Sequence, residues 1–511
     1  MVMLKKYMIF LAVILILFIA PISAENNITI DNTTFIQDTI DVASDDDIVY
    51  LNPGTYHESS IRITKNITLQ GLGETKDIVI DGGQKNSIIF IDKKVTVKLN
   101  NITFINGKTN DYGGAIYTEA AESVYIKNCI FENNSARMDG GAIEISSKSF
   151  GYPRKFFYGY LEIDNCSFIN NYAGFSGGAV GTYYANADVK NSEFINNYAG
   201  DFAGALSFVN GNFTVSSSKF ENNYADYDGG AIRQNVNSNL YIEDSIFINN
   251  TAKEWGGALY NWLGKLTVKN STISNNTAGI RGGGIFTAGP LTTTYSQITN
   301  NSAESGGALY VFQEFFTIEP IVICNYNSIT GNTASEGSIT YYDLLTYVKS
   351  DYENNYWGDI NPNSTKWFEE FITKIFTEPA PKTWLEEPPQ YIVENKTYNN
   401  DTNSEKTTSI NQDSNDKNRV KVSHNQDSND KNHIKKVSFN QNSTNDKPVD
   451  NLKVGNSANS IGGYGLDSKS ASYLNKKSMG INQINSNNNP ILVFIMLLVL
   501  FAYGIYRFKN K

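Results

Sequence analysis

The side chains that most often carry out covalent or acid–base chemistry are scarce in this sequence. It contains three cysteines and three histidines, at Cys129, Cys166, Cys324, His57, His424 and His433. None of the cysteines belongs to a Cys-x-x-Cys pair or stands near a histidine cluster, so the sequence predicts neither a zinc site nor a disulfide framework. The acidic run at residues 45–47 is typical of a solvated turn, with a calcium site as the alternative. The sequence therefore predicts no metal, no cofactor and no catalytic residue.

Aromatic side chains are the remaining candidates for recognition. Phe, Trp and Tyr together make up 13% of the chain. Tyr172, Tyr198 and Tyr224 share one position of an internal repeat, and Trp255 stands close to the next corner of that repeat. If these rings face outward, they form a strip suited to stacking on sugar rings or to binding a protein. The alternative is that they only stack on one another between neighbouring repeats.

One copy of the repeat carries an insertion that is both aromatic and basic. The insertion occupies residues 148–160 and contains Tyr152, Arg154, Lys155, Phe156, Phe157 and Tyr158. The chain as a whole is acidic, with 42 Lys and Arg against 52 Asp and Glu and a net charge of −10. Because exposed loops often carry binding function, the insertion is the best single candidate for contact with a partner. A nucleic-acid partner is not expected, since it would need a basic stripe.

These side chains are positioned by a repeat that runs from residue 101 to about residue 339. Each copy has a Gly pair, sometimes degenerate, followed by a small residue and an aliphatic residue, and successive pairs begin 24 to 37 residues apart. A Phe usually stands nine residues before the pair, and two Asn follow that Phe. The positions that define this pattern are Phe131, Phe168, Phe194, Phe220, Phe247, Asn134, Asn171, Asn197, Asn223 and Asn250.

Alternating apolar residues before each Phe, as at 124–129 and 161–166, predict short strands with one buried face. Several strands in each period, without helical spacing, indicate an all-β fold. We expect a right-handed parallel β-helix, or solenoid. Coils stacked about 4.8 Å apart place like residues above one another, which predicts a column of Phe rings and a ladder of Asn amides. Cys129 and Cys166 occupy the position of Ser192 and Ser218, so we interpret them as small ladder residues rather than a disulfide or a reactive thiol.

Both ends of the chain carry targeting or anchoring signals. Residues 1–24 have the basic start, apolar run and small-residue end of a secretory signal peptide, with a first membrane helix as the alternative. Residues 490–506 are apolar and precede a basic tail at 507–511, which predicts one transmembrane helix with a cytoplasmic tail rather than a buried core helix. Between these segments we expect four parts. They are an N-terminal cap with the first coils (25–100), the repeat-bearing β-helix (101–360), a transition (361–397) and a disordered stalk rich in Asn, Ser, Asp and Lys (398–489).

The repeats resemble those of known families. Asn-Asn followed by Gly-Gly-Ala-Ile, with a Phe shortly before, is similar to the repeats of the chlamydial polymorphic outer-membrane proteins and, more closely, to the adhesin-like surface proteins of methanogenic archaea. Residues 35–43 and 67–73 look like the opening of pectin-lyase-like β-helices, and this resemblance implies a short amphipathic helix at residues 35–43 that caps the first coil. The first resemblance implies a surface protein. The second resemblance includes families of polysaccharide lyases, esterases and hydrolases, which place carboxylates with Arg, Lys or His on one strand face. This sequence has no such set repeated across adjacent coils.

Together these features predict a membrane-anchored, adhesin-like protein of the cell surface that presents a β-helical rod to a glycan or protein of another cell or of the envelope. The protein is not expected to be an enzyme. An extracellular carbohydrate-active enzyme on the same fold and a passive structural envelope protein are the alternatives. In an exported chain, Asn-x-Ser/Thr triplets predict glycosylation, unless they arise by chance from an Asn-rich composition. The triplets begin at Asn27, Asn32, Asn66, Asn101, Asn133, Asn165, Asn212, Asn249, Asn270, Asn275, Asn300, Asn363 and Asn395.

Overall fold

The computed structural model describes residues 27–92, 94–119, 121–147, 149–150, 155–156, 158–313, 321–343, 349–359, 371–373, 383–385 and 388. Every described residue lies in one unit of the chain, Met1–Asn403. The predicted signal peptide, stalk, membrane anchor and tail, and most of the transition at 361–397, lie outside the described residues. Within the described residues, no helix is long and apolar enough to cross a membrane.

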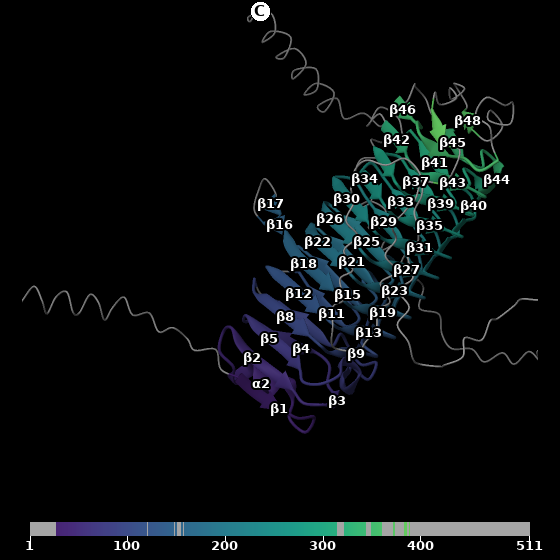
Figure 1. The fold of residues 1–511 in the computed structure, drawn as a ribbon. Helices are drawn as coiled ribbons and strands as arrows, with labels where there is room; N and C mark the ends of the chain where they lie inside the picture. The colour runs from purple at the N-terminus through teal and green to yellow at the C-terminus, as the bar shows by residue number, and fades with distance from the viewer. Residues whose placement is uncertain are drawn as a thin grey trace, which may run out of the picture. The chain divides into compact units, whose positions relative to one another are not determined.

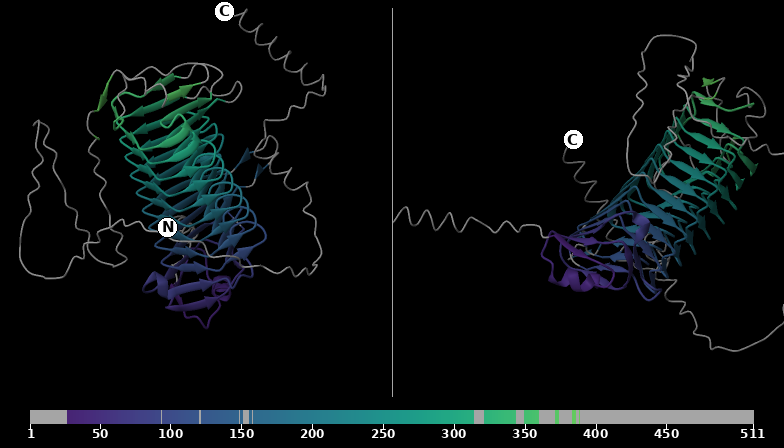
Figure 2. Two further views of the ribbon diagram at one scale, coloured as in Figure 1. Left: turned by 90° about the vertical axis from the view of Figure 1, so that its right-hand side faces the viewer. Right: turned by 60° about the horizontal axis from the view of Figure 1, so that its bottom comes forward.

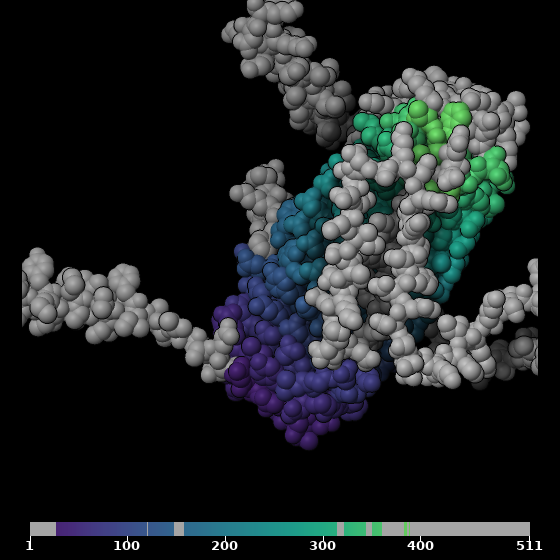
Figure 3. Space-filling view, in the orientation of Figure 1, coloured from purple at the N-terminus to yellow at the C-terminus, as the bar shows by residue number. Residues whose placement is uncertain are grey.

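The described part of the chain is an all-β parallel solenoid (Figures 1 and 2). Each repeat-bearing coil passes through four parallel sheets in the order sheet 1, sheet 2, sheet 3 and sheet 4 before it returns to sheet 1 one layer further along. The space-filling view shows the sequence advancing steadily from one end of the stack to the other (Figure 3). This architecture confirms the predicted all-β solenoid.

The bounds of the strands follow sheet by sheet. Sheet 1 contains β1 (Asn27–Ile30), β2 (Asp47–Leu51), β5 (Ile67–Gly71), β8 (Thr96–Asn100), β12 (Ser123–Lys127), β18 (Gly159–Asp164), β22 (Ala185–Lys190), β26 (Gly211–Ser216), β30 (Ser238–Glu243), β34 (Lys265–Lys269), β38 (Leu291–Thr294), β42 (Ile321–Asn325) and β46 (Lys349–Asp351). Sheet 2 contains β3 (Gly54–His57), β6 (Ile78–Asp81), β9 (Thr103–Ile105), β13 (Ile130–Glu132), β19 (Ser167–Ile169), β23 (Glu193–Ile195), β27 (Lys219–Glu221), β31 (Ile246–Ile248), β35 (Thr272–Ser274), β39 (Gln297–Thr299), β43 (Ser328–Thr330), β47 (Asn355–Tyr356) and β49 (Trp384–Leu385). Sheet 3 contains β10 (Lys108–Thr109), β14 (Ser135–Ala136), β20 (Tyr172–Ala173), β24 (Tyr198–Ala199), β28 (Tyr224–Ala225), β32 (Thr251–Ala252), β36 (Thr277–Ala278), β40 (Ser302–Ser305) and β44 (Thr333–Glu336). Sheet 4 contains β4 (Ile61–Ile63), β7 (Ile89–Ile91), β11 (Ile116–Thr118), β15 (Ile143–Ser146), β21 (Val180–Tyr183), β25 (Leu206–Val209), β29 (Ile232–Gln234), β33 (Leu259–Asn261), β37 (Ile285–Thr287), β41 (Leu309–Phe312), β45 (Thr340–Asp343) and β48 (Phe371–Thr373).

A short helix covers the first coils, as the sequence predicts. Helix α2 (Ile36–Val42) buries Ile36, Thr39 and Ile40 against the start of the stack. Its first two backbone N–H groups donate to the Glu58 carboxylate at 2.7 and 2.9 Å, which satisfies donors that a helix start leaves unpaired. The other helical segment among the described residues is the 3₁₀ turn η1 (Thr75–Asp77).

The core of the rod is a set of columns of like residues. Phe131, Phe168, Phe194, Phe220 and Phe247 are direct partners from one strand of sheet 2 to the next. Their rings are parallel, with centroids 4.7 to 4.8 Å apart, and they are inaccessible to solvent. The spacing matches the distance between hydrogen-bonded strands, so each ring fills the layer of its own coil and stacks on its neighbours in the column.

The corner between sheets 2 and 3 uses the two Asn of each pair differently. The second Asn, represented by Asn197, is buried and donates its amide to the Phe168 carbonyl at 2.9 Å and to Asn223 Oδ1 at 3.0 Å. Asn134, Asn171, Asn223 and Asn250 repeat this pattern. The first Asn of each pair, such as Asn196, is exposed and has a φ of 56°, in the left-handed region that Asn tolerates better than most residues. Only the second Asn therefore forms the ladder.

Candidate functional site

The three predicted tyrosines face outward from sheet 3. Strands β20, β24 and β28 each point their alanine inward and their tyrosine outward, and Tyr172, Tyr198 and Tyr224 are direct partners in neighbouring coils. Their ring centroids are 5.4 and 5.3 Å apart with interplanar angles of 10° and 4°. Tyr172 is 42% exposed, and the other two are half-buried. We call these three residues the tyrosine column.

The two predicted roles of these tyrosines are combined in the structure. The rings point outward, and they also stack on one another, so both faces of Tyr198 are covered by its neighbours. The part of Tyr198 that solvent meets is therefore mainly its ring edge and hydroxyl group. A sugar ring prefers an open aromatic face, whereas edges and hydroxyls suit contacts with protein side chains or hydrogen bonds to glycan hydroxyls.

An ion pair holds the hydroxyl end of the tyrosine column in place. The Tyr198 hydroxyl donates to Asp226 Oδ2 at 2.5 Å, and Lys253 forms an ion pair with the other oxygen of the same carboxylate. The Lys253 ammonium also lies 5.9 Å from the centroid of the Tyr224 ring, within cation–π range. The hydrogen bond to Asp226, together with burial, raises the pKa of Tyr198 to about 12. The tyrosine therefore remains protonated at neutral pH.

Trp255 does not belong to the tyrosine column. It lies at the corner between sheets 3 and 4, where its ring stacks on Phe286 with centroids 5.3 Å apart. It packs against a second aromatic cluster on the outer side of sheet 4, formed by Tyr260, Phe286, Tyr310 and Tyr341 with Trp262 and Phe312 at its edge. The Arg281 guanidinium lies 5.2 Å from the Trp255 ring and 5.0 Å from the Tyr310 ring.

Sequence reasoning missed this sheet 4 cluster, although its signal was present. The aromatic residue follows directly after the Gly-Gly-Ala-aliphatic motif, as in Tyr260 and Tyr310. The aliphatic residue before it points into the core, so strand alternation sends the aromatic residue to the outer side. Tyr260, Phe286 and Tyr310 are nearly inaccessible to solvent, so the cluster acts as a second packed layer rather than an open platform.

The same outer side of sheet 4 carries carboxylates that the sequence analysis also missed. Glu144, in β15, is 3% exposed, and its Oε2 lies where a side chain on Gly181 in the next coil would otherwise be. Burial, followed by the neighbouring Asp139 carboxylate, raises the pKa of Glu144 to about 8, and burial raises that of Asp139 to about 7. Among the described residues, Glu144 Oε2 and Asp139 Oδ1 have no hydrogen-bond partner. A carboxylic acid that remains protonated near neutral pH can act as a general acid.

A basic residue lies three coils further along the same side of sheet 4. Arg233 places its guanidinium 4.1 Å from the centroid of the Phe202 ring. Burial raises the pKa of nearby Asp228 to about 7, although the Arg233 charge opposes that rise. Within the part of the chain that the structure describes, no group of three or more His, Cys, Asp or Glu side chains is arranged to hold a metal ion.

The acidic run at residues 45–47 forms a turn. Asp46 has a φ of 69°. Asp45 Oδ1 accepts a hydrogen bond from the Asn66 backbone N–H at 2.8 Å, and Asp47 Oδ2 accepts one from the Ser44 backbone N–H at 2.7 Å. These two carboxylates therefore stabilise the turn.

The aromatic and basic insertion is described only in part. Ser149–Phe150 (β16) pairs antiparallel with Lys155–Phe156 (β17), and this hairpin stands out beside β18 (Figure 1). Tyr158 is 46% exposed and makes an edge-on contact with Tyr184, whereas Tyr152, Arg154 and Phe157 lie outside the described residues. The predicted boundary at residue 160 was wrong, because Gly159 and Tyr160 pair with sheet 1 as the first residues of β18.

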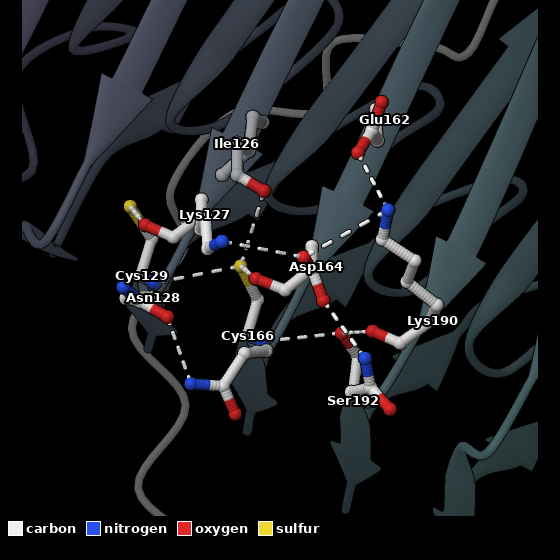
Figure 4. Close-up of polar contacts among 11 residues, drawn as sticks. Ile126, Lys127, Asn128, Cys129, Glu162, Asp164, Cys166, Lys190 and Ser192 are labelled. Carbon is white, nitrogen blue, oxygen red and sulfur yellow. Dashed lines mark hydrogen bonds and ion pairs between the residues drawn. The ribbon is translucent and has the colours of Figure 1, made fainter. Parts of the chain in front are cut away.

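Cys129 and Cys166 belong to a buried ladder beneath the corner between sheets 1 and 2. The Cys129 backbone N–H lies 3.4 Å from Cys166 Sγ, and the Cys166 N–H donates to Ser192 Oγ at 3.1 Å (Figure 4). All three cysteines of the chain are buried and free of disulfides. Burial raises the pKa of the Cys166 thiol well above its ordinary value, so this thiol is a poor nucleophile.

On the solvent side of the same region, Lys190 bridges two carboxylates of the preceding coil. Its ammonium lies 2.8 Å from Glu162 Oε1 and 3.8 Å from Asp164 Oδ2 (Figure 4). Surface ion pairs of this kind contribute little to stability.

Comparisons with known proteins support the sequence resemblance in part. Residues 128–146 and 244–261 match the model of the Chlamydia polymorphic membrane protein repeat. These two stretches each lie within one copy of the repeat, and no curated protein matches the chain. The closer resemblance to archaeal adhesin-like proteins stays a prediction.

Solved structures similar to the chain are polysaccharide-modifying proteins with low identity. The A-module of mannuronan C-5 epimerase AlgE6 from Azotobacter vinelandii is 13% identical, over 66% of this chain and 92% of that one, with a TM-score of 0.33. The PL6 family alginate lyase AlyGC is 12% identical, over 70% of this chain and 58% of that one, with a TM-score of 0.27. A mannuronic acid-specific family 6 lyase from human gut microbiota is 10% identical, over 68% and 90%, with a TM-score of 0.27. Likeness at this level carries no argument about activity.

Proposed function

We propose that this protein is a cell-surface rod that adheres to a glycan or protein of another surface, and that the tyrosine column is part of its contact face. The observation that carries this proposal is the outward, in-register placement of Tyr172, Tyr198 and Tyr224 on a rigid stack. The two matches to a chlamydial membrane-protein repeat support a surface location. The predicted signal peptide and C-terminal anchor fit the same role.

The tyrosine column is a preorganised binding surface. Each ring is already held by its stacking neighbours, so little side-chain entropy is lost when a partner binds. Tyrosine is also among the residues that dominate measured binding energy at interfaces. Because ring edges and hydroxyls face outward, the column favours a protein surface or hydrogen-bonded glycan hydroxyls over stacked sugar rings.

Replacing all three tyrosines of the column with valine is expected to weaken adhesion of the full-length protein by about tenfold or more, since a few tyrosines commonly contribute over 1.4 kcal/mol to binding. Valine keeps the strand preference of these positions. The measurement is binding of the purified full chain to intact cells and to an immobilised glycan panel. The control is the double variant Tyr125→Val/Tyr241→Val, which removes outward tyrosines from sheet 1 instead. Equal binding by the triple variant and the wild-type chain would remove the tyrosine column from the contact face.

A carbohydrate-active enzyme is the second candidate function, and the buried carboxylates on sheet 4 favour it. If Glu144 acts as a general acid, the full chain should release new reducing ends from a soluble polysaccharide, and Glu144→Gln should lower that rate by about 100-fold or more. Glu162→Gln is the matched control, because Glu162 is a carboxylate of sheet 1 that bonds only on the surface. Absence of cleavage across acidic and neutral polysaccharides at pH 5 to 8 would leave adhesion as the function.

A further inference from the structure

Six of the Asn-x-Ser/Thr triplets in the repeats occupy equivalent positions at corners of the coil, whereas the triplet of Asn212 lies within strand β26. The first residue of the triplet lies at a left-handed corner, with φ between 45° and 56°, and faces solvent, fully or in part. The second residue is the buried ladder residue, and the third is an outward or half-buried Ser or Thr at the start of the next strand. These six triplets begin at Asn133, Asn165, Asn249, Asn270, Asn275 and Asn300. The acceptor Asn is therefore never the Asn whose amide is buried in the ladder.

Three of these asparagines form an uninterrupted series. Asn249, Asn275 and Asn300 occupy the same corner between sheets 2 and 3 in three consecutive coils, and all three are exposed. Within the described residues, their side-chain amides form no hydrogen bond. The amides of the other corner triplets are engaged. For example, Asn165 Nδ2 donates to Asn128 Oδ1 at 2.8 Å, and Asn270 Nδ2 donates to Asp244 Oδ1 at 2.6 Å.

The series begins where the tyrosine column ends. Along sheet 3, the outward position reads Tyr172, Tyr198, Tyr224, Thr251, Thr277, Ser302 and Thr333. The hydroxyl residues Thr251, Thr277 and Ser302 complete the triplets of Asn249, Asn275 and Asn300. In the tyrosine coils the corner asparagines have the same backbone conformation but no Ser or Thr two residues later, so they are not acceptors.

We propose that Asn249, Asn275 and Asn300 carry N-linked glycans, which form a ridge along this corner and leave the tyrosine column uncovered. In the reaction, the Asn amide nitrogen bonds to the anomeric carbon of a lipid-pyrophosphate-linked oligosaccharide. The glycosyl–phosphate bond breaks, the lipid pyrophosphate leaves with the bonding electrons, and the amide nitrogen loses one proton. The inference depends on the export that the proposed function also requires.

Glycopeptide mass spectrometry of the full chain, purified from membranes of an N-glycosylating host, tests the proposal. We expect glycan mass on the peptides that contain Asn249, Asn275 and Asn300, and none on the peptides that contain Asn196 and Asn222. The variant Thr251→Val/Thr277→Val/Ser302→Ala keeps all three asparagines and should lose all three modifications. Thr333→Val is the matched control, because it changes the same column two residues after Gly331 and should leave the glycan pattern unchanged.

The N-terminal peptide separates failure of this inference from failure of the proposed surface location. If residues 1–24 have been removed and the three asparagines are unmodified, the glycan ridge is wrong while surface display stands. If residues 1–24 are retained and the three asparagines are unmodified, both are wrong.

A gain of glycosylation gives a test that does not depend on losing a residue from the triplets. Tyr198→Thr places a hydroxyl two residues after Asn196, whereas Tyr198→Val does not. Both variants lose the same tyrosine ring, so any difference in folding between them is small. We expect one additional glycan, on Asn196, in the Tyr198→Thr variant alone. An unmodified Asn196 in that variant, in a chain modified at other asparagines but not at Asn249, Asn275 and Asn300, would show that this corner is not accessible to the transferase and would overturn the proposal.

Discussion

Replacing Asn223 with alanine is expected to lower the free energy of unfolding of the rod by about 4 kcal/mol. The Asn223 side chain accepts hydrogen bonds from the Asn197 backbone N–H and side-chain amide, both at 3.0 Å. It donates to the Phe194 carbonyl at 2.8 Å and to Asn250 Oδ1 at 2.9 Å. All four bonds are buried, and a methyl group replaces none of them, so several polar groups lose their partners away from water.

The adjacent residue is the control for this prediction. Asn222 is exposed and has a φ of 56°, so Asn222→Ala should cost only about 1 kcal/mol, through the strain of a left-handed alanine. Urea denaturation of the full chain, followed by far-UV circular dichroism, measures both effects. Similar midpoints for the two variants would show that the Asn ladder does not stabilise the stack.

The columns of the fold could be predicted from the sequence because they repeat at constant spacing. Phe194 and Asn197 lie three residues apart, and so do their counterparts in the other coils. Neighbouring coils stack with this segment in register, so identical residues of successive coils contact one another. A pattern that is local in the sequence therefore predicts a tertiary contact. The same reasoning placed Cys166 in the column of Ser192, and the structure shows that bond.

The carboxylates on the outer side of sheet 4 could not be predicted in the same way, because neighbouring coils carry unlike residues at those positions. The contact between Glu144 and Gly181 joins residues 37 positions apart, across the longest copy of the repeat. Their pairing depends on where the insertion leaves and rejoins the coil. The end of that insertion was predicted two residues too late. Raised carboxylate pKa values also arise from burial by several elements, a property that no single stretch of sequence contains.

Orientation was the other property that the sequence left open. Two-residue strands such as Tyr198–Ala199 are too short to show an alternating pattern, so the outward direction of the tyrosines was visible only after Ala199 was found in the core. Trp255 was grouped with these tyrosines by its distance along the chain from a corner. The structure separates them because Trp255 lies at the corner between sheets 3 and 4, directly before Gly256, where its ring stacks on Phe286 of sheet 4.

Gly230→Ala is expected to destabilise the rod by about 3 kcal/mol or more, although it adds only one methyl group. The added Cβ would lie 2.0 Å from the Gly257 carbonyl oxygen of the next coil. Relieving that overlap requires the two coils to separate at a corner where the Gly230 N–H donates to the Gly256 carbonyl at 3.0 Å. In the last described coil, the second position of the pair is Ser338, which has a side chain. This residue follows β44, the last described strand of sheet 3, so no further described strand of that sheet has to stack against it.

The first position of the same Gly pairs supplies the opposite control. Ala203 stands there with a φ of 58°, whereas the equivalent residue in the next coil is Gly229, with a φ of 70°. Ala203→Gly should therefore stabilise the rod by up to about 1 kcal/mol, because it relieves left-handed strain. Urea midpoints that shift downward for Gly230→Ala and upward for Ala203→Gly would separate the two roles of the pair, namely backbone conformation at its first residue and close approach of coils at its second. A Gly230→Ala midpoint equal to that of the wild-type chain would mean that the coils are not stacked as closely as this corner requires.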